Sequence, residues 1–216
     1  MADTATQRAN MVEGSVRTND VTDPRIYGAL REVPRERFVP TAKRALAYAD
    51  VPVEIAPGRF LLDPRTFGKL LQLAGLRATD RVLDVACGTG YSTVVLAKIV
   101  KSVIGLEQDA DLVRIASDLI PQSGATNASI MQGGLTEGAK GPFDVIVIEG
   151  GVDAVPEQLL AQLAEGGRLV AIVAPPGGQG RAQLFVREKG GVGSRLDFDA
   201  TVPALAGFKK VVGFVF

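Results

Sequence analysis

The residues with the clearest chemical purpose are a glycine-containing turn and an acid that follows it. The turn lies in Arg81-Val-Leu-Asp-Val-Ala-Cys-Gly-Thr-Gly-Tyr91, and Glu107 follows sixteen residues after Tyr91. Gly88 and Gly90 let the backbone approach a ligand, because a side chain there would stand in the way. Glu107 is expected to end the next strand, where its carboxylate can accept hydrogen bonds from two ribose hydroxyls. This combination predicts a site for a nucleoside-containing cofactor.

The residue types of the turn distinguish two kinds of nucleoside site. The pattern is Asp84-x-Ala86-x-Gly88-x-Gly90, so Ala86 stands where the dinucleotide-binding fingerprint has its first glycine. We therefore favour the turn of an S-adenosylmethionine-dependent methyltransferase, whose ligand carries a methionine tail and no pyrophosphate, over a dinucleotide site. A helix is expected to begin near Tyr91 and to present unpaired N–H groups to the ligand. A tight turn that binds no ligand is the remaining alternative.

The absence of histidine restricts the chemistry further. The 216 residues include no histidine and a single cysteine, Cys87. This composition excludes a histidine general base, a Ser-His-Asp triad and a histidine metal ligand, and it gives no basis for a structural zinc site. We expect no metal, and we expect Cys87 to fill the turn rather than act as a nucleophile, because no histidine activates it. Methyl transfer from a sulfonium tolerates these limits, because the cofactor supplies the activated group.

Charge and hydropathy exclude several classes of partner. The chain has 24 basic and 24 acidic residues, which gives no electrostatic basis for binding nucleic acid or a membrane surface. No apolar run reaches the length of a membrane span, and the first residues lack the apolar core of a secretory signal. One cysteine cannot form an intramolecular disulfide, which fits a cytoplasmic location. The length is that of one domain with a sizeable core, and the oligomeric state stays open.

From residue 81 onward, short apolar runs alternate with helix-length segments. This alternation predicts an α/β fold with a doubly wound, mainly parallel sheet. After the parallel part, residues 183–188 and 195–200 are expected to pair as an antiparallel hairpin, and 209–216 to form a final strand. The predicted strands are 81–86, 102–107, 128–132, 143–149 and 167–174, and the predicted helices are 91–100, 109–120 and 156–164.

Residues 1–60 lack strand alternation and are expected to form a helical N-terminal extension. Helices are predicted over 7–16 and 22–32, the second with Thr22 as its N-cap. The chain then divides into this extension, which covers the substrate, and a cofactor-binding methyltransferase domain over 61–216. We expect the two parts to pack as one compact unit.

A series of motifs runs through the chain in a fixed order. The motifs are Met11-Val-Glu13, Val16-Arg17, Asp23, Val33-Pro-Arg-Glu-Arg-Phe-Val-Pro40, Ala47-Tyr-Ala-Asp50, Leu83 to Tyr91, Glu107, Val155-Pro156, Gly166-Gly-Arg-Leu-Val170 and Val202-Pro203. In this order and spacing, the chain resembles the protein-L-isoaspartate (D-aspartate) O-methyltransferase family over nearly its whole length. The resemblance implies a class I, Rossmann-like methyltransferase fold with a seven-stranded sheet, a helical extension and an antiparallel C-terminal strand. It also implies S-adenosyl-L-methionine as cofactor, S-adenosyl-L-homocysteine as product and an isoaspartyl carboxylate in a damaged protein or peptide as acceptor, whose esterification starts repair.

The resemblance breaks at the acceptor side. The family has Thr-Ile-Ser-x-Pro before the helix that opens at Pro64; here both hydroxyls are lost and Leu62 takes the serine position, beside the family's reacting carboxylate. The family's Gly-Asp-Gly, whose acid faces the adenine, becomes Gly133-Gly134-Leu135, and its Thr-Ala-Ala becomes Glu149-Gly150-Gly151. The catalytic residue is therefore unassigned. The predicted cofactor-binding residues are Asp84, Ala86, Gly88, Gly90, Tyr91, Glu107 and Gly134.

Two carboxylates are candidates for the acceptor side. Glu149 is expected at the rim of the crevice, because ligands of doubly wound sheets lie at the C-terminal ends of the strands. Asp63 approaches from the start of a helix predicted over 61–76, although an Asp before Pro is first of all a helix cap. Together they would oppose an ionised acceptor by ~1 kcal/mol or more per close pair, unless Arg59 and Arg65 offset the repulsion. Hydrogen bonding of Glu149 to nearby loop amides is the competing interpretation.

Three functions follow from these patterns. The first is methylation of isoaspartyl residues, which the lost hydroxyl and the added acids predict to be weak. The second is methylation of another acceptor by the same fold, for example a neutral or cationic small molecule recognised by Glu149. The third is a non-catalytic relative that binds the nucleoside or a partner protein. Because one fold carries many functions, the site must decide among them.

Overall fold

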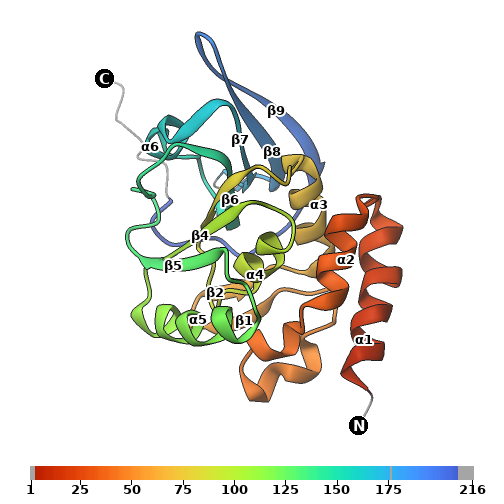
Figure 1. The fold of residues 1–216 in the computed structure, drawn as a ribbon. Coiled ribbons are helices and arrows are strands. Elements are labelled where there is room, and N and C mark those ends of the chain that lie inside the picture. Colours follow the sequence, from red (N-terminus) through yellow and green to blue (C-terminus); the bar gives the residue numbers. More distant parts are fainter. Residues whose placement is uncertain (1–2, 176, 209–216) are drawn as a thin grey trace.

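A seven-stranded sheet with helices on its two faces and a separate two-stranded sheet form the described part of the chain, residues 3–175 and 177–208 of a computed structural model (Figure 1). The helices are α1 (Thr4–Met11), α2 (Pro24–Glu32), α3 (Pro64–Ala74), α4 (Tyr91–Ala97), α5 (Ala110–Gln122) and α6 (Glu157–Ala161), with the shorter helical turns η1 (Val12–Val16), η2 (Arg17–Asn19), η3 (Arg35–Phe38) and η4 (Thr41–Leu46). The strands are β1 (Val53–Ala56), β2 (Arg59–Leu61), β3 (Arg81–Val85), β4 (Ser102–Glu107), β5 (Ala128–Gln132), β6 (Phe143–Val152), β7 (Leu163–Val173), β8 (Arg181–Glu188) and β9 (Gly191–Asp199).

The large sheet has seven strands in the order β5-β4-β3-β6-β7-β8-β9. Strands β3 to β7 pair in parallel, whereas β8 is antiparallel to both β7 and β9. The chain enters the sheet at its centre with β3, builds outward through β4 and β5, and returns to the other side of β3 with β6. Ligands of such sheets lie beyond the carboxyl ends of the strands where this reversal occurs. The predicted doubly wound, mainly parallel α/β sheet is confirmed.

Alternate residues of the central strands pack into two separate cores. Val145 and Val147 of β6 join the core formed with the N-terminal helices, whereas Ile146 and Ile148 join the core on the opposite face, where α6 contributes Leu159. The alternation follows from the period of two along a strand. Because both faces are covered, these strands are continuously apolar, as is typical of parallel sheets.

The strands and helices predicted between residues 81 and 200 are present in the structure, but most begin or end a few residues away from the predicted positions. Two predicted strands, 102–107 and 128–132, have the predicted bounds. Those predicted over 81–86 and 143–149 differ at one end, and the strand predicted over 167–174 differs at both ends. The antiparallel hairpin is also present, as β8 and β9, but its turn is shorter than expected and falls at Lys189 and Gly190. The predicted final strand over 209–216 lies outside the described residues.

The N-terminal sixty residues correct several expectations. The first helix begins earlier than predicted and becomes a π-helical turn at Val12, and the cap of α2 is Asp23 rather than Thr22, since the Asp23 carboxylate accepts from Arg25 N. A β-hairpin, β1–β2, lies where no strand was expected. As a result the helix predicted over 61–76 begins only at Pro64. Its predicted cap is confirmed, because Asp63 Oδ1 accepts from Thr66 N at 2.8 Å.

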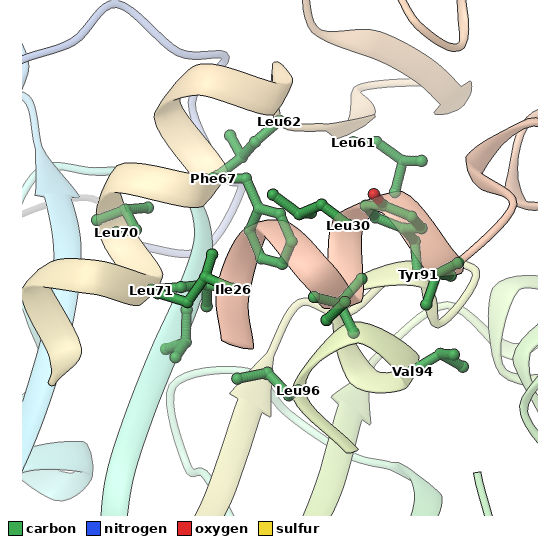
Figure 2. Packing of buried hydrophobic residues seen from close by; sticks show 14 of the residues in the cluster. Ile26, Leu30, Leu61, Leu62, Phe67, Leu70, Leu71, Tyr91, Val94 and Leu96 are labelled. Atoms are coloured by element: carbon green, nitrogen blue, oxygen red, sulfur yellow. The ribbon is translucent and has the colours of Figure 1, made fainter. Parts of the chain in front are cut away.

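The N-terminal helices share a core with the helices that follow them. In Figure 2, Ile26 and Leu30 of α2 lie against Phe67 and Leu71 of α3, and all four are buried. The predicted domain boundary at residue 60 stays a prediction, and it falls inside the β1–β2 hairpin. Among the described residues, none of the helices has both the length and the apolar character needed to cross a membrane.

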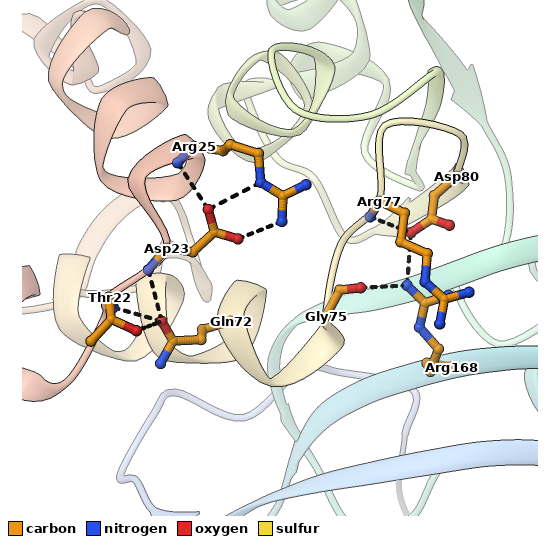
Figure 3. A network of polar contacts seen from close by, with 8 residues as sticks. All are labelled: Thr22, Asp23, Arg25, Gln72, Gly75, Arg77, Asp80 and Arg168. Carbon is orange, nitrogen blue, oxygen red and sulfur yellow. Dashed lines mark hydrogen bonds and ion pairs between the residues drawn. The ribbon is translucent and has the colours of Figure 1, made fainter.

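Buried polar side chains connect the end of α3 to its surroundings (Figure 3). Arg168 of β7 donates to the carbonyls of Ala74 and Gly75 at 3.0 and 2.8 Å and to Asp80 Oδ2 at 2.7 Å. Asp80 also accepts from Arg77 N at 2.8 Å. The last carbonyls of a helix have no intrahelical donor, so the guanidinium satisfies groups that would otherwise be buried without partners.

We expect Asp80→Asn to lower the free energy of unfolding by about 3 kcal/mol, because the variant leaves the Arg168 charge buried without its carboxylate. Urea unfolding followed by circular dichroism measures the loss. The matched control is Asp199→Asn, which breaks the exposed Arg181–Asp199 pair and should cost less than about 1 kcal/mol. Equal losses in the two variants would contradict this account of the network.

Candidate functional site

Three carboxyl groups lie near the carboxyl ends of three neighbouring strands. Asp84 is in β3, Glu107 ends β4 and Glu149 is in β6. Their exposed fractions are 0%, 0% and 7%. Burying a carboxylate costs free energy unless it is paired, hydrogen-bonded or protonated, so the partners of each group decide its charge.

Glu107 is fully satisfied as a carboxylate. Arg59 of β2 donates to it in a bidentate manner, with Nη1–Oε1 at 2.5 Å and Nη2–Oε2 at 2.6 Å. Oε1 also accepts from the backbone N–H groups of Gln108 and Asp109, and Oε2 from that of Gly88 at 2.9 Å. The sequence placed Glu107 at the end of its strand but did not indicate that Arg59 points inward.

The turn after β3 has the backbone geometry that its sequence requires. Ala86, Gly88 and Gly90 have φ angles of 65°, 59° and 90°. A left-handed alanine is strained by roughly 1 kcal/mol, and such strain is concentrated at functional sites. A Cβ on Gly88 would lie 2.4 Å from Cδ1 of Ile55 in β1, so the β1–β2 hairpin packs directly on the turn.

Asp84 holds the start of α4 to the end of β3. Its Oδ2 accepts from Ser92 Oγ at 2.7 Å and Thr93 Oγ1 at 2.6 Å. Its Oδ1 has no hydrogen-bond partner among the described residues. Burial raises the pKa of Asp84 to about 6, with a smaller rise from the charge of Glu107, while the two hydroxyls act in the opposite direction.

Two other predicted cofactor residues have different surroundings. Tyr91 is buried, with its ring against Phe38 and Phe67 at centroid distances of 5.6 and 5.8 Å and the Arg35 guanidinium 4.7 Å from its centroid. Its side chain thus packs with the N-terminal extension. Gly134 is exposed. A Cβ there would lie 1.7 Å from the Glu137 carboxylate, so the Glu137 side chain occupies the space beside it.

The residues that the sequence assigns to the acceptor side border a small, mostly apolar hollow that is too narrow to admit a water molecule. Leu62 and Glu149 both line it, together with Phe60 and with Pro203, Ala204 and Leu205 of the C-terminal segment. Glu149 Oε1 has no partner among the described residues. Leu62 is fixed by its carbonyl, which accepts from Arg35 Nη2 at 2.5 Å.

The surroundings of Glu149 bear on the repulsion that the sequence predicts. Burial, and next the charge of Asp84, hold the pKa of Glu149 well above its usual range, and Arg35 only partly opposes them. The surroundings of Glu149 therefore favour its protonated form, and a protonated Glu149 would not repel an acceptor carboxylate. Asp63 Oδ1 caps α3, and Asp63 does not line the hollow that Leu62 and Glu149 share.

Cys87 lies inside the turn, pressed against β4. It is 1% exposed, and a Cβ on Gly105 would come within 2.9 Å of its Sγ and 2.7 Å of Thr93 Oγ1. Burial raises the pKa of the Cys87 thiol, and the charges of Asp84 and Glu107 raise it further. These surroundings support its prediction as a turn-filling residue.

Sequence reasoning missed Arg35 and left open whether Arg59 points inward. Arg35 is 1% exposed and donates to the carbonyls of Ala47 and Leu62, and Arg59 is 7% exposed and binds Glu107. The signal for Arg59 is its place directly before the apolar run Phe60-Leu61-Leu62, where a charge needs a buried partner.

The acceptor groups around the turn suit a cationic nucleoside cofactor. Glu107 would supply carboxylate oxygens for ribose hydroxyls, and Asp84 Oδ1 and Glu149 Oε1 are buried acceptors without partners among the described residues. Such acceptors match the positive charges of a sulfonium and of a methionine amino group. Arg59 and Ile55, both from the β1–β2 hairpin, cover the same turn. The side chains of the site therefore suit the cofactor chemically, and the hairpin encloses the place where it would bind.

The doubly wound sheet, the glycine turn and the terminal acid define a class I methyltransferase. The sequence profile of the protein-L-isoaspartate (D-aspartate) O-methyltransferase family matches residues 6–200. The chain belongs to this family, whose members are S-adenosylmethionine-dependent methyltransferases.

Individual relatives agree with this assignment. Protein-L-isoaspartate O-methyltransferases of Koribacter versatilis and Methylorubrum extorquens are 35% and 36% identical to the chain, covering 90% and 95% of it and 88% and 91% of their own lengths. A Plasmodium falciparum structure named as a protein-L-isoaspartate O-methyltransferase, in complex with S-adenosyl-L-homocysteine, has a TM-score of 0.78 at 24% identity and covers 95% of this chain and 99% of its own. At that identity, the likeness shows a shared fold.

The raised pKa of Asp84 predicts a specific dependence of stability on pH. Between its unfolded value of 3.8 and its folded value of about 6, the folded protein holds a proton that the unfolded chain has released. The contribution of Asp84 to stability therefore falls as pH rises through this window. Relative to Asp84→Asn, wild type should lose on the order of 2 kcal/mol of unfolding free energy between pH 4 and 7.

Urea unfolding at several pH values measures this difference. Asp111→Asn, which removes an exposed carboxylate at the start of α5, is the control and should follow the wild-type curve. A constant difference between wild type and Asp84→Asn across the range would contradict the assigned protonation.

Proposed function

We propose that this protein transfers the methyl group of S-adenosylmethionine to the carboxylate of isoaspartyl residues in damaged proteins, forming a methyl ester. The observation that carries the proposal is the family match over residues 6–200, which includes the turn and Glu107. The buried carboxyl groups and the left-handed turn support it, since they gather at the sheet edge where ligands of this fold bind.

The available side chains suit a reaction that needs positioning and no base. The cofactor supplies an activated methyl group when bound. An isoaspartyl carboxylate is already ionised at neutral pH, so a chain without histidine loses nothing at this step. The residues then have to hold the acceptor oxygen in line with the methyl group and exclude water, as the apolar walls Phe60 and Leu62 would do. Glu107 would hold the ribose, and the backbone of residues 86–90 would face the ligand.

The acceptor hollow supports a second candidate. Leu62 offers no hydroxyl, and Glu149, whose pKa burial raises, has an oxygen without a hydrogen-bond partner among the described residues. This arrangement favours a neutral acceptor that exchanges one hydrogen bond with Glu149. The same cofactor and fold would then serve a small molecule instead of a protein.

Transfer of labelled methyl groups to an isoaspartyl peptide and to its aspartyl twin separates these functions. We expect label on the isoaspartyl peptide only. Label on neither peptide, together with binding of S-adenosylhomocysteine measured by calorimetry, would favour the second candidate or a relative that only binds.

The protonation of Glu149 makes isoaspartyl transfer sensitive to alkaline pH. As pH rises through its raised pKa, Glu149 gains a charge that repels the acceptor carboxylate by ~1 kcal/mol, and kcat/KM should fall about fivefold. Glu149→Gln cannot ionise and should show no such fall. Identical alkaline profiles for the two proteins would show that Glu149 does not face the acceptor.

A further inference from the structure

The carboxylate that would bind ribose has no free hydrogen-bonding capacity in this structure. Five donors converge on Glu107, two from the Arg59 guanidinium and three from backbone N–H groups. A carboxylate offers about four lone-pair positions. Two ribose hydroxyls can therefore bind only if existing donors leave.

Arg59 is the donor that can leave. The three backbone donors, from Gly88, Gln108 and Asp109, belong to the glycine turn and to the residues directly after Glu107, so they are part of the sheet edge itself. Arg59 comes from β2, and β1 and β2 form a two-stranded sheet separate from the seven-stranded sheet. A two-stranded hairpin has little stability of its own and depends on the contacts that it makes.

The same hairpin also covers the turn. Ile55 of β1 lies over Gly88, and Arg59 Nη2 donates to the Ala86 carbonyl at 3.1 Å. Both features that would meet a nucleoside, the turn and Glu107, are therefore covered by one segment. The turn that joins the two strands includes Gly58. Its φ of +70° lies in the left-handed region, which glycine adopts without strain.

We propose that Arg59 is a latch: it closes the β1–β2 hairpin over the glycine turn, and a nucleoside ligand must displace it from Glu107 to bind. This inference rests on the proposed function for the identity of the ligand. Phe60 and Leu62, which follow Arg59 directly, line the acceptor hollow. Opening the latch therefore moves the wall of the acceptor site and couples binding of donor and acceptor.

Calorimetric titration with S-adenosylhomocysteine tests the latch. In wild type, only the fraction of molecules with an open hairpin binds, so the apparent affinity is reduced by that fraction. Arg59→Gln should bind about tenfold more tightly, and Arg59→Lys, which keeps the charge without the bidentate geometry, should fall between Arg59→Gln and wild type. Arg65→Gln, which removes an exposed arginine near the start of α3, should bind as wild type does.

Hydrogen exchange of the protein without ligand gives a second readout. Amides of residues 53–61 should exchange several-fold faster in Arg59→Gln than in Arg65→Gln. Weaker binding by Arg59→Gln would overturn the latch and make Arg59 a ligand contact. Unchanged binding with unchanged exchange would show that the ion pair is only structural. If no variant binds S-adenosylhomocysteine, the proposed function fails and the displacement step with it, while the exchange rates still decide whether Arg59 holds the hairpin closed.

Discussion

The burial of three carboxyl groups at one edge of the sheet is the constraint on which the site depends. Each group meets it differently: Glu107 by an arginine and backbone amides, Asp84 by two hydroxyls, and Glu149 by a raised pKa that favours its protonated form. The charges are linked, since ionised Glu107 raises the pKa of Asp84 and ionised Asp84 raises that of Glu149. The ion pair with Arg59 allows one full negative charge to persist where three would repel one another.

Both compensating cations come from the N-terminal extension. Arg35 lies on η3 and Arg59 on β2, whereas the carboxyl groups lie on β3, β4 and β6. The extension is thus part of the electrostatics of the site as well as of the core that it shares with α3 and α4. Departures from the family pattern at residues 60–62 lie in this same segment, which explains why one short stretch affects both the cofactor side and the acceptor side.

Structural elements that follow from a repeated or local sequence pattern could be predicted, whereas individual contacts between distant residues could not. Alternating apolar runs gave the parallel sheet, and an Asp before a Pro gave the cap of α3. The β1–β2 hairpin was missed because its strands have four and three residues and lie next to prolines, so they show no usable alternation. The direction of Arg59 and the raised pKa of Glu149 depend on burial by distant segments, which no local pattern encodes.

The position of Cys87 has a consequence for how the protein tolerates oxidants. Thiolates, not thiols, react with peroxide and with disulfides, and reaction also requires access. The single cysteine of the chain is buried between the turn and β4, and its surroundings oppose ionisation. The single thiol of the chain is therefore protected from oxidation and disulfide exchange. The geometry of the turn does not depend on whether the surrounding solution is oxidising or reducing.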